Sequence, residues 1–133
     1  MKLVYPAIFS PCEEGGYMVE VPDLPGCVTE GDTLAEAIFM GEDAASGWVL
    51  LELEEGRDAP AASRMEDIRP EEGSFVSLLS LDMDAYAEKY GAKAVRKNLT
   101  IPAWLNTFAE RQKVNFSQVL TDALTELYQK SVQ

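Results

Sequence analysis

The stretch Lys93-Ala94-Val95-Arg96-Lys97-Asn98-Leu99-Thr100-Ile101-Pro102 decides how the C-terminal part of the chain folds. Side chains alternate between the two faces of a strand. The polar face therefore consists of Arg96, Asn98 and Thr100. A strand on its own leaves its backbone groups unpaired. Two copies paired antiparallel across a two-fold axis would pair them, and such a ribbon fits the major groove of DNA.

Two amphipathic helices are predicted after this strand. Pro102 lacks an N–H group, which suits the exit from a strand and the first turn of a helix. Asn115 can cap the second helix, and Gln118 completes a box-like pair with it. The second helix carries a long apolar stripe that a tail of this size cannot bury, so a dimer core is expected. The predicted interface residues are Leu99, Ile101, Phe116, Leu120 and Leu124.

The polar face of the strand has side chains that can read base edges. Arginine can donate to guanine and asparagine can pair with adenine, while threonine can contact either base. The N–H groups at the start of the second helix can hold a DNA phosphate. The predicted DNA-binding residues are Lys93, Arg96, Lys97, Asn98, Thr100, Asn115 and Ser117. The alternative is that the strand face is only solvated.

Charge is distributed unevenly along the chain. Residues 1–90 contain 5 lysines and arginines and 20 aspartates and glutamates, a formal charge of −15. Residues 91–133 contain 6 and 3, a charge of +3. A phosphate-binding surface needs positive charge, so only the C-terminal part suits DNA. The acidic part would repel DNA and attract a basic protein.

The N-terminal part is predicted to be a small α+β domain with the order β-β-β-α-β. The alternation of apolar residues predicts strands over 3–9 and 17–21, and further strands are predicted over 27–30 and 75–81. Thr33 and Glu36 have the spacing of a capping box at the start of a helix that runs to about residue 53. Its predicted apolar face is formed by Leu34, Ala37, Ile38, Gly41, Ala45 and Trp48. Residues 57–73 are predicted as a mobile loop or a loop with a bent helical turn, and 83–90 as a short helix or connector that Gly91 ends. The charge changes sign beyond Gly91, which predicts two domains, 1–90 and 91–133.

Composition argues against several classes of protein. No apolar run reaches the roughly 18 residues that a membrane span needs, and the start lacks the features of a signal peptide, so a cytoplasmic protein without a membrane partner is expected. The chain has no histidine, and its two cysteines, Cys12 and Cys27, do not form a CxxC motif. A zinc site is not expected, the cysteines are predicted to be reduced thiols, and no cofactor is predicted.

Two groups of motifs resemble known families. Residues 96–102, together with Asn115-Phe116-Ser117-Gln118-Val119-Leu120, resemble a ribbon-helix-helix DNA-binding domain. The N-terminal part resembles the HicB antitoxin domain. Its matching stretches are Tyr5-Pro6-Ala7, Gly15-Gly16-Tyr17, Pro22-Asp23-Leu24-Pro25-Gly26-Cys27, Thr29-Glu30-Gly31-Asp32-Thr33 and Glu36-Ala37. Together these stretches cover most of the chain.

The resemblance implies the antitoxin of a HicA–HicB type toxin–antitoxin pair. Toxins of this family are small basic RNA-cleaving proteins, and the antitoxins bind them and repress their own operon. The implied N-terminal fold is a partial RNase H fold. The implied partners are a HicA-like toxin, operator DNA and a second copy of the chain, as a homodimer through the C-terminal domain or a higher oligomer.

The acidic residues expected to face the toxin are Glu13, Asp23, Glu30 and Asp32. For any one of them the alternative is a solubilising surface charge. Two other functions remain open. One is a ribbon-helix-helix repressor that senses a small ligand, and the other is a degenerate RNase H-like enzyme. Catalysis is not expected, because no convincing set of carboxylates for a two-metal site appears at the strands. Glu20 and Asp82 lie there, and the other acidic residues are mainly in loops and on the helix.

Overall fold

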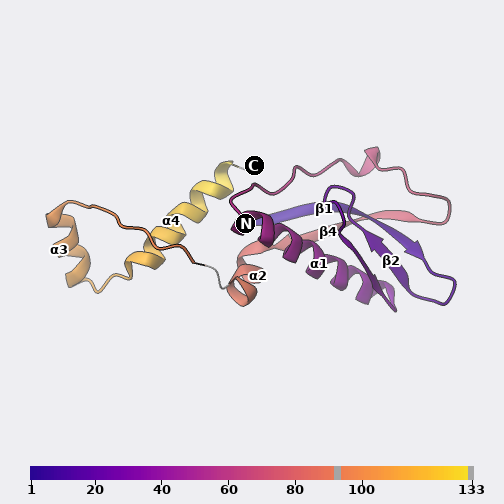
Figure 1. The fold of residues 1–133 in the computed structure, drawn as a ribbon, viewed down its shortest axis with the longest axis horizontal. Coiled ribbons are helices and arrows are strands. Elements are labelled where there is room, and N and C mark those ends of the chain that lie inside the picture. The colour runs from indigo at the N-terminus through magenta and orange to yellow at the C-terminus, as the bar shows by residue number, and fades with distance from the viewer. Residues whose placement is uncertain (92–93, 132–133) are drawn as a thin grey trace. The chain divides into compact units, whose positions relative to one another are not determined.

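A computed structural model describes residues 1–91 and 94–131. Contacts within the chain divide it into two compact units, with the boundary between residues 93 and 94. The N-terminal unit is a mixed α+β fold, and the C-terminal unit contains two helices (Figure 1). None of the described helices combines the length and apolar character that crossing a bilayer requires.

The N-terminal unit is a four-stranded antiparallel sheet with helices. Its strands are β1 (Lys2–Pro11), β2 (Tyr17–Glu20), β3 (Val28–Gly31) and β4 (Phe75–Asp82), in the order β3-β2-β1-β4. Helix α1 (Leu34–Glu54) follows β3, and α2 (Met83–Tyr90) follows β4. A 3₁₀ turn, η1 (Met65–Asp67), interrupts the long connection between α1 and β4. The predicted β-β-β-α-β order, the short helix after it and the α+β class are confirmed.

The core lies between one face of the sheet and α1. Tyr5, Ala7 and Phe9 alternate along β1 and are buried on this face. The strand register places Val19 opposite Phe9 and Leu79 opposite Tyr5, and both of these are also buried. The strand predicted over residues 3–9 is therefore confirmed, and its alternate apolar residues from Tyr5 to Phe9 face the core.

Small residues let α1 approach the sheet closely. The residues it buries are Ala37, Gly41, Ala45, Ser46 and Val49. A Cβ atom on Gly41 would lie 3.1 Å from side-chain atoms of both Leu79 and Val19, so no larger residue fits there without adjustment. The predicted apolar face is wrong in part: Leu34 is 41% exposed and Trp48 is only half-buried. The spacing of apolar residues predicted an apolar face of the helix, whereas closeness to the sheet determines which residues are buried.

The start of α1 is held by a side-chain cap. The Glu36 N–H donates to Thr33 Oγ1 at 3.1 Å, and Glu36 Oε2 accepts from the Asp32 N–H at 3.3 Å. The predicted capping box forms, with its return bond one residue earlier than in the usual box. Directly before it, Gly31 lies against the first turn of α1, where a Cβ atom would be 2.4 Å from Ala37 N.

The C-terminal unit contains α3 (Ala103–Arg111) and α4 (Phe116–Ser131). Lys113 lies just beyond the end of α3 and has a left-handed backbone conformation, with φ of 56°. The Val114 N–H donates to the Ala109 carbonyl across this turn, as in a Schellman motif. Asn115 Oδ1 accepts from the Gln118 N–H at 3.0 Å, which confirms the predicted cap. The prediction that Gln118 completes a box-like pair with Asn115 is wrong, because the Gln118 side chain donates to Asp122 Oδ1 instead.

Residues 94–102 form no strand in this single chain. They are exposed throughout, including Val95 at 77% and Leu99 at 65%. A strand needs a neighbour for its backbone hydrogen bonds, and none of the described residues supplies one here. The predicted strand over this segment is thus absent from the isolated chain.

The close contact at the start of α1 predicts a large difference between two glycine-to-alanine changes. Gly31→Ala would place a methyl group against backbone atoms, so we expect a loss of about 1–3 kcal/mol in the free energy of unfolding. Gly47→Ala is the matched control, because its Cβ would meet only the side chain of Tyr86, with the hydroxyl at 3.0 Å. In a helix interior, alanine is also more favourable than glycine by about 1 kcal/mol. Urea unfolding measures both. Equal stabilities would contradict the close approach.

Candidate interaction surfaces

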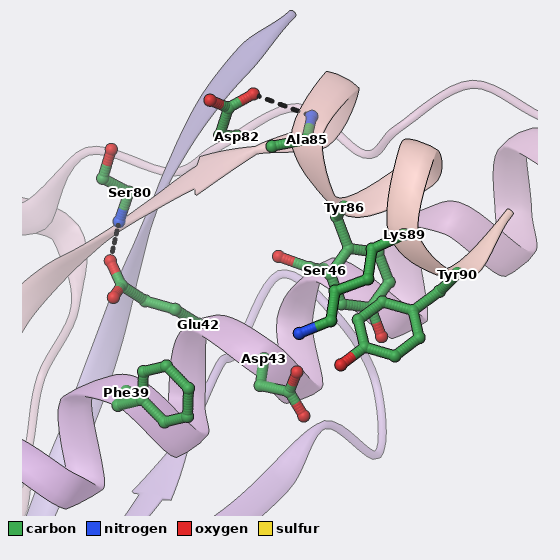
Figure 2. Close-up of a pocket in the computed structure, with 10 residues that line it drawn as sticks. All are labelled: Phe39, Glu42, Asp43, Ser46, Ser80, Asp82, Ala85, Tyr86, Lys89 and Tyr90. Carbon is green, nitrogen blue, oxygen red and sulfur yellow. Dashed lines mark hydrogen bonds between the residues drawn. The ribbon is translucent and has the colours of Figure 1, made fainter.

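An open cavity of about 280 Å³ lies between α1, the end of β4 and α2 (Figure 2). From α1, the lining residues are Phe39, Glu42, Asp43 and Ser46. From β4 and α2, they are Ser80, Asp82, Ala85, Tyr86, Lys89 and Tyr90. All of these residues belong to the N-terminal unit, and three of them carry carboxylates. Sequence reasoning did not identify this site.

Two of the cavity carboxylates also hold the local backbone. Glu42 Oε2 accepts a hydrogen bond from the Ser80 N–H at 3.0 Å, which satisfies a donor of the edge strand β4. Asp82 Oδ1 accepts from the Ala85 N–H at 3.2 Å and caps α2. Asp43 has no hydrogen-bond or ion-pair partner among the described residues and is exposed. Its charge is therefore available to a partner.

Aromatic rings form the α2 side of the cavity. The Tyr86 and Tyr90 ring centroids are 4.6 Å apart, and Lys89 Nζ lies 5.3 Å from the Tyr90 centroid. Burial raises the pKa of the Tyr86 hydroxyl, and the charge of Asp43 raises it further. Tyr86 thus stays neutral as a hydrogen-bonding group at physiological pH.

The residues predicted to face a basic partner do not form one patch. Glu13 lies in the turn between β1 and β2, and Glu30 and Asp32 lie at the same end of the sheet, because β3 ends opposite Tyr17. Asp23 follows the other end of β2. It accepts from the Ser63 N–H at 2.8 Å and from the Ser63 hydroxyl at 2.5 Å. Asp23 therefore ties the long α1–β4 connection to the sheet.

The predicted nucleic-acid side chains are accessible. Arg96, Lys97, Asn98 and Thr100 are exposed in the extended segment before α3. Ser117 lies in the first turn of α4, next to the Asn115 cap. Lys93 falls outside the described residues.

The C-terminal unit also exposes much apolar surface. The large apolar side chains exposed on α3 and α4 are Trp104, Leu105, Phe108, Phe116, Val119, Leu120, Leu124 and Leu127. The proposed interface residues Leu99 and Ile101 are exposed as well. Apolar surface on this scale is typical of an interaction site.

The strand carboxylates do not converge on a metal site. In the sheet, Glu20 lies opposite Ile8 and Asp82 lies opposite Lys2. Lys2 and Ile8 are six residues apart along β1, so the two carboxylates are separated by about 20 Å at the rise of a strand. Among the described residues, no group of three or more cysteine, aspartate or glutamate side chains is arranged to hold a metal ion. Both cysteines are free thiols in the structure, and burial raises the pKa of Cys27.

A helical spacing could have pointed to the cavity. Phe39, Asp43 and Ser46 follow one another at intervals of four and three residues, which puts them on one face of α1. Asp82, Tyr86 and Lys89 repeat this spacing along α2. The pattern mixes acids with aromatic residues, so a search for an apolar core face passes over it.

Comparison with known proteins identifies the family. A family model described as the HicB-like antitoxin of a bacterial toxin–antitoxin system matches residues 5–123. The chain belongs to this HicB-like antitoxin family. The match extends from β1 into α4, so it includes both compact units of the antitoxin.

Individual proteins agree with this assignment. An uncharacterised 14.9 kDa protein of Haemophilus phage HP1 is 33% identical to the antitoxin over 106 residues, which cover 77% of this chain and 76% of that protein. A chain of a toxin–antitoxin complex from Streptococcus pneumoniae superposes with a TM-score of 0.61 at 27% identity, covering 95% of this chain and 99% of that one. The Burkholderia pseudomallei antitoxin HicB gives a TM-score of 0.56 at 26% identity, with coverage of 94% and 98%.

The two bonds from Ser63 to Asp23 predict a specific effect on the α1–β4 connection. Asp23→Ala removes both acceptors, and hydrogen bonds to a charged group contribute about 1.5–3 kcal/mol. We expect cleavage within residues 57–73 by limited proteolysis to be roughly tenfold faster, because this segment opens locally more often. Glu13→Ala is the control, since Glu13 has no partner among the described residues. Equal cleavage rates would argue against the tie.

Proposed function

We propose that this antitoxin binds and neutralises a basic, HicA-like RNA-cleaving toxin through its N-terminal unit. We further propose that it represses its own operon through a ribbon-helix-helix dimer of its C-terminal unit. The observation that carries the proposal is the family match, which extends through both units. The similar chain from Streptococcus pneumoniae comes from a toxin–antitoxin complex, which supports a protein partner.

Charge supports the division of labour between the units. The formal charge of −15 on residues 1–90 favours binding of a basic protein and disfavours binding of a nucleic acid. The formal charge of +3 on residues 91–133 has the sign that phosphate contacts need. A basic RNA-cleaving toxin and an operator are thus assigned to opposite ends of one chain.

The exposed segment before α3 supports a dimer. Residues 94–102 have unpaired backbone groups, and a second copy of the same segment would pair them as a two-stranded ribbon. The same association would cover Leu99, Ile101, Phe116, Leu120 and Leu124, which are all exposed in the single chain. Arg96, Asn98 and Thr100 would then face the bases.

The alternative of a ligand-sensing repressor gains little support from the cavity. Small-molecule sites usually enclose most of the surface of their ligand. The cavity here is open and has three carboxylates in its lining. An open, acidic site suits a basic side chain of a protein partner better than an enclosed metabolite.

Co-expression tests the antitoxin function. We expect a small basic protein to be encoded beside this chain. We expect the chain to rescue growth of cells that express that protein and to co-purify with it. Arg96→Ala should rescue growth equally, because Arg96 is assigned to DNA. Association of the two purified proteins should slow as salt rises, since a higher ionic strength screens charge steering. A chain that neither rescues growth nor binds this protein would refute the proposal.

Mobility shifts at fixed salt test the DNA-binding function. Arg96→Ala and Asn98→Ala should each weaken binding to the DNA upstream of the gene by about 1–3 kcal/mol, the usual scale of a base contact. The control is Arg64→Ala, which removes an exposed arginine from the N-terminal unit and should change little. Unchanged binding in both Arg96→Ala and Asn98→Ala would rule out this strand face as the reader.

A further inference from the structure

We propose that the cavity between α1 and α2 receives an arginine side chain of the basic partner protein. The identity of the partner rests on the proposed function, whereas the preference for a guanidinium group rests on the chemistry of the cavity itself. Three features of the cavity support this: a hydroxyl that faces the cavity, available carboxylate oxygens and a set of aromatic rings.

Ser46 supplies the hydroxyl. The residue is only 5% exposed, and its side chain has no hydrogen-bond partner among the described residues. It lines the cavity, and Figure 2 shows its hydroxyl directed into that space. A hydroxyl oxygen can accept a hydrogen bond. Ser46 is therefore placed to accept from a donor that enters the cavity.

Two carboxylates beside Ser46 can accept further hydrogen bonds. Asp43 has no hydrogen-bond or ion-pair partner among the described residues. Glu42 accepts from the Ser80 N–H through Oε2, and its Oε1 accepts no hydrogen bond from the described residues. A guanidinium group presents five N–H donors in a planar fork and no acceptor. It can therefore satisfy the hydroxyl and both carboxylates together, with charge-assisted bonds. An anionic or phosphorylated ligand would be repelled by the same groups.

The rings favour arginine over lysine. Phe39 is 66% exposed at the edge of the cavity, opposite the Tyr86 and Tyr90 rings of α2 (Figure 2). A planar guanidinium stacks on aromatic faces, which a compact ammonium group does less well. Lys89 Nζ already lies near the Tyr90 ring, so the cavity holds a cation of the chain's own. Lys89 is exposed, and its long stem allows it to swing away when an arginine enters.

A small probe tests the cavity without any toxin. The full-length, ¹⁵N-labelled protein is titrated with N-acetyl-arginine methylamide, and the neutral citrulline analogue serves as the control ligand. We expect arginine-dependent shifts of the Ser46, Tyr86 and Tyr90 amide signals and none with citrulline. Asp43→Asn should abolish these shifts, whereas Asp58→Asn, the same charge change at an exposed site outside the cavity, should keep them. No shift at these residues in the wild-type protein would overturn the proposal.

The basic partner tests the assignment to the toxin. Asp43→Asn should weaken its binding about tenfold, the scale of one charge-assisted hydrogen bond, while Asp58→Asn should change it less than about twofold. Lys89→Met should tighten binding because it removes the competing cation, and Lys2→Met is its control. Circular dichroism establishes that every variant is folded.

The outcomes separate the two claims. If Asp43→Asn and Asp58→Asn weaken partner binding equally, the cavity is not the docking site, although the proposed antitoxin function stands. If the arginine probe binds in the cavity but the basic protein binds no form of the chain, the proposed function fails, although the preference for a guanidinium group stands.

Discussion

The close approach of α1 to the sheet is the constraint on which the N-terminal unit depends. Gly31 and Gly41 mark the two points where α1 comes closest to the sheet, at the end of β3 and at the side chains of Val19 on β2 and Leu79 on β4. Ala37 and Ala45 continue this contact and are fully buried. Because the helix lies so near, its next face, with Glu42, Asp43 and Ser46, is brought against β4 and α2. The cavity is therefore a consequence of the same small residues that form the core.

Much of this fold could be predicted from the sequence, because local patterns determine it. Alternation identified β1 and β2, and β3 and β4 were also predicted as strands. The spacing of Thr33 and Glu36 identified the start of α1. The buried face of α1 was harder, since Trp48 is only half-buried and donates to the Pro25 carbonyl, while Ser46 is buried. Hydrophobicity does not report how near a helix lies to its neighbour. The cavity joins residues about 40 positions apart, which no local pattern can place.

The C-terminal unit shows a different limit. The caps of α4 and the exit at Pro102 follow from local chemistry, and the structure contains both helices. The strand before them depends on a partner, because its hydrogen bonds must come from another segment. In a single chain, Leu99 and Ile101 are exposed and residues 94–102 have no regular structure. The side chains proposed to read DNA thus acquire a fixed face only after two copies associate.

Hydrogen exchange of the full-length antitoxin tests the proposed division of labour most directly. In the free protein at micromolar concentration, the account predicts slowed amide exchange in residues 94–102, because a ribbon of two chains already pairs them. Adding the basic partner should slow exchange further in α1, β4 and α2, and adding operator DNA should slow it only in the C-terminal unit. Rapid exchange of 94–102 in every state, or protection by the basic partner confined to residues 94–131, would contradict it.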